Sequence, residues 1–87
     1  MDEELKELYD DIIWSLNRYG SLSQEEAQHR LEESGLFDNI RMEAGRAALV
    51  HETGYYWAMS ILYAKNDPQW FQNPELWPPP NDYYEEE

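Results

Sequence analysis

Apart from carboxylates, this chain has few residues that could act as catalysts or metal ligands. It contains no cysteine and two histidines, His29 and His51, which excludes disulfides, thiolate metal sites and a cysteine nucleophile. His51 precedes Glu52, but no second histidine follows at the fourth position, as the helical zinc-protease motif requires. The sequence also has no phosphate-binding glycine loop, calcium loop or nucleophile elbow. We therefore expect a protein that is not an enzyme and has no cofactor and no metal.

Carboxylates are abundant, and their positions suggest two kinds of role. The chain has 19 Asp and Glu against 6 Lys and Arg, a formal charge of −13 at pH 7. Acids in the first turn of a helix are favoured by the helix dipole. Acids beyond the first turn gain nothing from the dipole. A like-charge pair at i,i+4, such as Glu7 and Asp11, also destabilises the helix by about 0.2–0.5 kcal/mol. We expect a solvent-facing ladder that binds a partner through Glu3, Glu7, Asp10, Asp11, Glu25, Glu32 and Glu33.

Such a ladder has a possible chemical use. Side chains one turn apart on a helix have Cβ atoms about 5–6 Å apart, which is of the same order as the spacing of phosphates along a nucleic-acid strand. Ordered carboxylates could then occupy the Lys/Arg channel of a nuclease or DNA-binding protein and be attracted there as DNA is. The alternative is a solvated face that keeps the protein soluble.

Aromatic residues form a second group near the C-terminus. Trp77 is followed by three prolines, and Tyr83 and Tyr84 stand between acidic residues. Trp and Tyr are typical binding hot spots, so these three side chains are predicted to contact a partner. The structural alternative is a lid in which Trp70, Phe71 and Trp77 fold back over a thin core. A combination places Trp70 and Phe71 in the core and Tyr83 and Tyr84 outside.

Three helical segments must position these groups. From residue 3 to 19, apolar residues recur at helical spacing and predict one buried stripe: Leu5, Leu8, Tyr9, Ile12, Ile13 and Leu16. Gly20 is a natural C-terminal stop. Ser23 and Glu26 form a capping box that opens a second helix to about residue 34. That helix has a thin apolar side, Ala27 and Leu31, and ends at Gly35.

The third predicted helix runs from residue 40 to about 65, with Asp38 or Asn39 as its cap. It is apolar or small on most sides, as expected of a central helix. Gly54 costs roughly 1 kcal/mol in a helix interior, so we expect either a kink there or two helices meeting at residues 52–54. From residue 66 onward five prolines favour extended geometry.

The whole is predicted to be an all-α fold. It comprises a helical domain over residues 1–65 and a Pro/aromatic-rich acidic segment over 66–87 that packs on the helices as part of the same folding unit. The 87 residues are 41% hydrophobic, enough to fold. No apolar run approaches the roughly 18 residues that a membrane span needs. Met-Asp-Glu-Glu is unlike a signal peptide, so we expect a cytoplasmic protein.

These observations favour a binding protein over a catalyst. So acidic a surface opposes contact with nucleic acid or membrane and suits a basic protein partner, such as a nucleic-acid-binding protein or nuclease. In size and charge, without a shared motif, the chain is similar to small inhibitors such as DNA mimics, anti-restriction and anti-CRISPR proteins. One alternative is an antitoxin or immunity protein that neutralises a basic toxin or nuclease through aromatic anchors. Another is a structural or adaptor subunit, for which a homodimer is one form.

Overall fold

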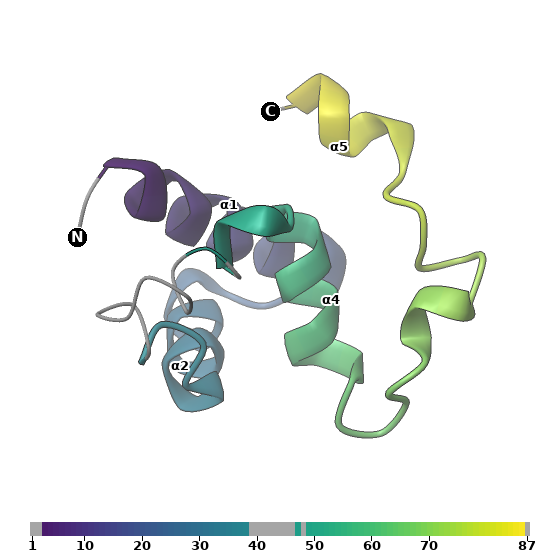
Figure 1. Ribbon diagram of the computed structural model, residues 1–87, viewed down its shortest axis with the longest axis horizontal. Coiled ribbons are helices and arrows are strands. Elements are labelled where there is room, and N and C mark those ends of the chain that lie inside the picture. Colours follow the sequence, from purple (N-terminus) through teal and green to yellow (C-terminus); the bar gives the residue numbers. More distant parts are fainter. Residues whose placement is uncertain (1–2, 39–46, 48, 87) are drawn as a thin grey trace.

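The structure, a computed structural model, describes residues 3–38, 47 and 49–86, and its regular elements are helices (Figure 1). The described residues contain no strand, which confirms the all-α prediction. In chain order the elements are α1 (Glu3–Gly20), α2 (Gln24–Ser34), α4 (Gly54–Tyr63), the short 3-10 helix η1 (Trp70–Gln72) and α5 (Asn81–Glu86). Within the described part of the chain, no helix is both long and apolar enough to cross a bilayer.

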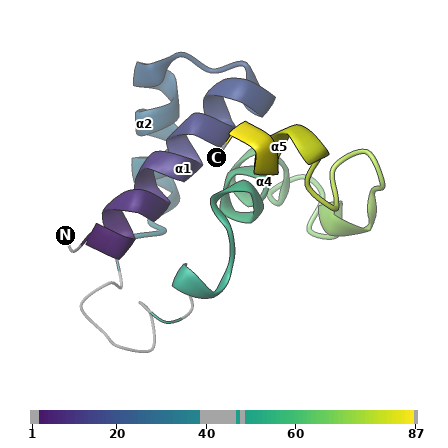
Figure 2. The same cartoon turned by 90° about the horizontal axis from the view of Figure 1, so that it is seen from above.

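Helix α1 is the element against which the others pack. Its predicted apolar stripe is buried at Leu5, Ile12, Ile13 and Leu16. Figure 2 shows α2 along one side of α1, and α4 with α5 on the other side. An amphipathic helix with neighbours on two sides leaves one face for solvent, and that face carries many of the charges.

The end of α1 differs slightly from the prediction. Gly20 still belongs to the helix, and Ser21 takes the left-handed conformation with φ of 56°. Gly20 instead leaves room for close packing, because a Cβ there would lie 3.0 Å from both terminal carbons of Leu62. The glycine therefore lets α4 approach the end of α1.

Helix α2 begins and ends as the sequence predicts. The Ser23 hydroxyl accepts a hydrogen bond from the Glu26 N–H, and the Glu26 carboxylate accepts one from the Ser23 N–H, each 3.1 Å long. Hydrogen bonding to the Glu26 carboxylate, first by the Ser23 N–H and then by the Ser23 side chain, lowers the pKa of Glu26. Gly35 ends the helix in the left-handed conformation at φ of 69°. The capping box is confirmed, and Ala27 and Leu31 are the buried residues of this helix.

The predicted helical segment that ends near residue 65 is interrupted at residues 52 and 53. Residues 49–51 are helical, the chain leaves the helix at residues 52 and 53, and α4 ends at Tyr63. Thr53 caps α4 by accepting a hydrogen bond from the Tyr56 N–H at 3.2 Å, so Gly54 opens a helix and does not interrupt one. The alternative of two helices meeting at residues 52–54 is confirmed. The predicted cap at Asn39 and the start at Ile40 lie outside the described residues.

The core lies where α1, α2 and α4 meet. It includes two aromatic residues of the C-terminal segment, Trp70 and Tyr83, which are 2% and 4% exposed. That segment is not simply extended, because α5 begins directly after Pro80, the last proline, and Tyr83 N–H donates to the Pro80 carbonyl at 3.0 Å. Prolines prevent helix formation only at their own positions and just before them. The cluster at the centre comprises Ile12, Ile13, Leu16, Ala27, Leu31, Tyr55, Ala58, Met59, Trp70 and Tyr83.

Candidate functional site

Asp11 was expected to face solvent with the other acids of α1, and this expectation is wrong. Its Oδ2 accepts hydrogen bonds from the Tyr83 hydroxyl at 2.6 Å and from the Gly54 N–H at 3.0 Å. Its Oδ1 is buried and has no hydrogen-bond partner among the described residues. A Cβ on Gly54 would lie 2.3 Å from Asp11 Oδ2. Asp11 therefore joins α1 to the start of α4 and to α5, and its carboxylate cannot reach a partner.

A second acid, Asp82 of the C-terminal segment, also bonds within the fold. Asp82 Oδ2 accepts hydrogen bonds from Arg18 Nη2 at 2.6 Å and Arg18 Nε at 2.9 Å, and Oδ1 accepts one from the Tyr19 hydroxyl at 3.3 Å. The hydrogen bonds from Arg18 hold the pKa of Asp82 below its usual value. Burial, followed by the charge of Asp82, raises the pKa of Tyr19. We call this set, with Asp11, Gly54 and Tyr83, the α1–α5 junction.

Of the three aromatic residues predicted to contact a partner, Tyr84 alone has an exposed side chain. Tyr83 is buried, with its ring centroid 5.5 Å from that of Tyr55 and 6.1 Å from that of Trp14. Its predicted place outside the core is therefore wrong. Trp77 is half-buried, with its ring centroid 5.8 Å from that of Trp70. Tyr84 is 62% exposed.

Phe71 also departs from its expected place. It was expected in the core beside Trp70, yet it is 45% exposed. Phe71 and Tyr84 are the large apolar side chains that the described surface exposes most. Neither stands within a larger exposed group of its kind there, and scattered apolar side chains are ordinary on a protein surface.

The remaining acids of α1 lie on its outer face. Glu3, Glu7 and Asp10 are exposed. Across the described ranges, no lysine or arginine comes within ion-pair distance of any of the three. Glu3 and Glu7 are one turn apart, so their charges repel without local compensation.

Helix α2 adds a second set of acids. Glu25 and Glu32 are exposed and line one hollow of about 390 Å³ together with Glu26 and His29. Neither has an ion-pair partner within the part of the chain that the structure describes. Glu33 differs, because its Oε1 lies 2.7 Å from His29 Nε2 and it borders another cavity, between α2 and α4.

Helices α1 and α2 pack along one seam. Tyr9 of α1 and Glu32 of α2 line the same small cavity of about 180 Å³, and Asn17 of α1 donates a hydrogen bond to Gln24 of α2 at 3.3 Å. Both helices carry exposed acids, which line separate hollows: Glu7 lines one with Thr53 and Gly54, and Glu25 and Glu32 line the other on α2. We call this set the acidic face: Glu3, Glu7, Asp10, Glu25 and Glu32.

The chemistry of the acidic face is recognition of cations. Carboxylates accept hydrogen bonds and attract lysine and arginine, most strongly where a partner excludes water. In the described ranges, no group of three or more His, Asp or Glu side chains is arranged to hold a metal ion.

Comparison with protein-family models, curated proteins and solved structures gives no match. The candidate site consequently stands on its own geometry.

Proposed function

We propose that this protein is a non-catalytic binding protein whose acidic face occupies a basic surface of a protein partner. The partner class is a nucleic-acid-binding protein or nuclease, because such proteins present rows of lysine and arginine to phosphates. The protein would then act as an inhibitor by competing with nucleic acid. It would not bind nucleic acid itself.

One observation carries the proposal. Acids that the fold needs are bonded internally, as Asp11 and Asp82 are, whereas among the described residues the acids of the acidic face have no lysine or arginine within ion-pair distance. Repulsion between neighbouring carboxylates costs stability, and a cationic partner would offset that cost. Electrostatic attraction would also accelerate association, with a strong dependence on salt.

The test uses charge reversal on the acidic face alone. Glu7, Asp10, Glu25 and Glu32 are changed to lysine together, leaving Asp11 untouched because its loss would damage the fold. The wild type and the variant are used to capture proteins from a lysate, with washes at low salt and at about 0.5 M salt, where the screening length falls to a few ångströms. Wild type should capture nucleic-acid-binding proteins that duplex DNA displaces and that the variant loses.

Single reversals locate the contact. Glu25→Lys and Glu75→Lys change the same exposed residue type and the same charge, but only Glu25 belongs to the acidic face. The first should weaken binding to a captured partner and the second should not. Retention of the partner by the fourfold variant, through the high-salt wash, would contradict the proposal.

The aromatic alternative, an antitoxin or immunity protein, is supported by the exposure of Tyr84 and Phe71. In that case Tyr84→Ala should abolish binding, and the complex should survive about 0.5 M salt because apolar contacts are not screened.

A homodimeric adaptor is the third possibility. Sedimentation at low and high protein concentration distinguishes it, because a strict monomer excludes self-association.

A further inference from the structure

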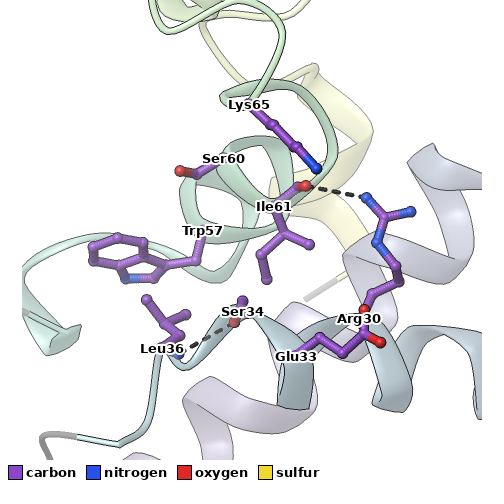
Figure 3. A pocket seen from close by; sticks show the side chains of 8 residues that line it. All are labelled: Arg30, Glu33, Ser34, Leu36, Trp57, Ser60, Ile61 and Lys65. Atoms are coloured by element: carbon purple, nitrogen blue, oxygen red, sulfur yellow. Dashed lines mark hydrogen bonds between the residues drawn. The ribbon is translucent and has the colours of Figure 1, made fainter.

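A cavity of about 480 Å³ opens between α2 and α4, outside the acidic face (Figure 3). Residues one turn apart along α4 form one wall, and the end of α2 with the turn after it forms the other. Its volume lies within the range of about 300–1,000 Å³ that is usual for small-molecule sites. The cavity is lined by Arg30, Glu33, Ser34, Leu36, Trp57, Ser60, Ile61 and Lys65.

The lining is polarised. In Figure 3 the charged ends of Arg30 and Lys65 both point toward one end of the cavity, whereas the Trp57 ring and Leu36 lie at the other end. Ile61 stands between the two ends. The cavity thus offers positive charge at one end and an apolar surface at the other.

Both cations lack a carboxylate partner among the described residues, although the chain has 19 acids. Arg18, by contrast, is paired with Asp82. The nearest acid on the wall, Glu33, has its Oε1 at 2.7 Å from His29 Nε2. Positive charge at the cavity therefore remains available to an anion.

The walls are held in place before any ligand enters. Arg30 Nη2 donates a hydrogen bond to the Ile61 carbonyl at 3.2 Å, and Trp57 Nε1 donates one to the Leu49 carbonyl at 2.8 Å. Guanidinium has five N–H donors, so Arg30 keeps others for a ligand. A fixed ring and a fixed cation reduce the entropy lost on binding.

We propose that this cavity binds a small amphipathic carboxylate. The carboxylate lies between Arg30 and Lys65, and the apolar chain lies along Ile61 toward the Trp57 ring. The net charge of −13 opposes an approaching anion, but at about 0.15 M salt charges more than about 8 Å away are largely screened. The charged side chains on the wall itself, the two cations and the one carboxylate of Glu33, consequently dominate the local interaction, and their formal sum is positive.

Octanoate is the probe, with octanamide as its uncharged counterpart and acetate as a carboxylate without a chain. Binding is followed by NMR at the Trp57 indole N–H and by calorimetry at physiological salt. Octanoate should bind saturably and shift the Trp57 signal. Octanamide should bind about three- to fivefold more weakly, as expected for the loss of exposed ion pairs. Acetate should not shift the Trp57 signal.

Lys65→Gln is the deciding variant, because the exposed Lys65 side chain makes no hydrogen bond in the described structure that the fold would lose. It should weaken octanoate about three- to fivefold and leave octanamide unchanged. Lys6→Gln makes the same charge change at an exposed position of α1 and should leave the affinity for both ligands unchanged. Arg30→Gln is interpreted only if its thermal midpoint matches that of wild type, because Arg30 also bonds the Ile61 carbonyl.

The proposal is overturned if octanoate does not bind saturably at millimolar concentration, if octanamide binds equally well, or if Lys6→Gln weakens octanoate as much as Lys65→Gln. These results do not depend on the acidic face. The cavity and the proposed partner binding can therefore fail separately.

Discussion

Asp10 and Asp11 are neighbours in sequence and belong to two different regions. Asp10 is exposed on the acidic face, whereas Asp11 receives hydrogen bonds from Gly54 and Tyr83 at the α1–α5 junction. A helix turns about 100° per residue, so adjacent side chains point toward different surroundings. The same residue type thus stabilises the fold at one position and remains free for a partner at the next.

The comparison separates two uses of negative charge. At the junction each carboxylate accepts hydrogen bonds from donors of other parts of the fold, and the donors to Asp11 are partly buried. On the acidic face the carboxylates satisfy no described donor of the fold and repel one another. Removing charge should therefore destabilise the protein in the first region and leave its stability unchanged, or raise it, in the second.

The largest effect is expected for Asp11→Ala compared with Asp10→Ala. The first change leaves the Tyr83 hydroxyl and the Gly54 N–H without their acceptor, at a cost of about 2–4 kcal/mol for the two donors together. The second should stay within about 0.5 kcal/mol of wild type. Urea unfolding measures both, and equal midpoints would remove the distinction between the two regions.

Gly54→Ala should be next in size. A Cβ would lie 2.3–2.7 Å from three atoms of Asp11, and crowding of this kind costs about 1–3 kcal/mol. Gly20→Ala is the matched control, because the atoms it meets at 3.0 Å are the mobile ends of Leu62, and it should cost under about 1 kcal/mol. An Asp11→Gly background removes all three of these Asp11 atoms, including the Cβ at 2.7 Å, so most of the Gly54→Ala cost should vanish there. If it persists, the clash is not with Asp11.

Acid should weaken the junction through Asp82. Its pKa is lowered in the folded protein, chiefly by the hydrogen bonds from Arg18, so its contribution is present above the ordinary aspartate pKa of about 4 and is lost as pH falls through the lowered value. Thermal midpoints at pH 7 and pH 3 should therefore differ less in Arg18→Gln than in wild type. Lys6→Gln should retain the wild-type difference. If Arg18→Gln instead lowers the thermal midpoint equally at pH 7 and pH 3, the pH dependence does not come from the pair of Arg18 and Asp82.

The smallest effect belongs to the acidic face. Glu7→Gln removes a like charge one turn from Glu3 and should raise the free energy of unfolding by about 0.2–0.5 kcal/mol at low salt. The gain should shrink as salt screens the repulsion. A loss of stability on neutralising Glu7 would show that the fold uses it.

Local sequence patterns predicted most of the helices. The stripe containing Leu5, Ile12 and Leu16 repeats within one segment, and the capping box joins Ser23 to a residue three positions on. Both depend on neighbours along the chain. The Thr53-Gly54 pair also held a usable signal, since threonine is a common N-cap and marks the start of α4.

The candidate site was harder to predict, because it depends on distant residues. Asp11 is an acid of α1 one turn from Glu7, and the local pattern does not distinguish the two. The internal role of Asp11 arises only because Tyr83, 72 positions away in the chain, packs against it. Tyr83 is buried for the same reason. Arg30 had no distinguishing local pattern, because its cavity forms only when α2 and α4 pack side by side on α1.

The hydrogen bond between Asp11 and Tyr83 also bears on synthesis of the chain. Both α1 and α2 are made well before residue 83, and their mutual contacts span a short stretch of sequence. Asp11 must remain hydrated until the last helix emerges, and closing so long a loop carries an entropic cost that local contacts avoid. We expect nascent chains stalled before residue 83 to form α1 and α2 while the region around Gly54 stays open to proteases.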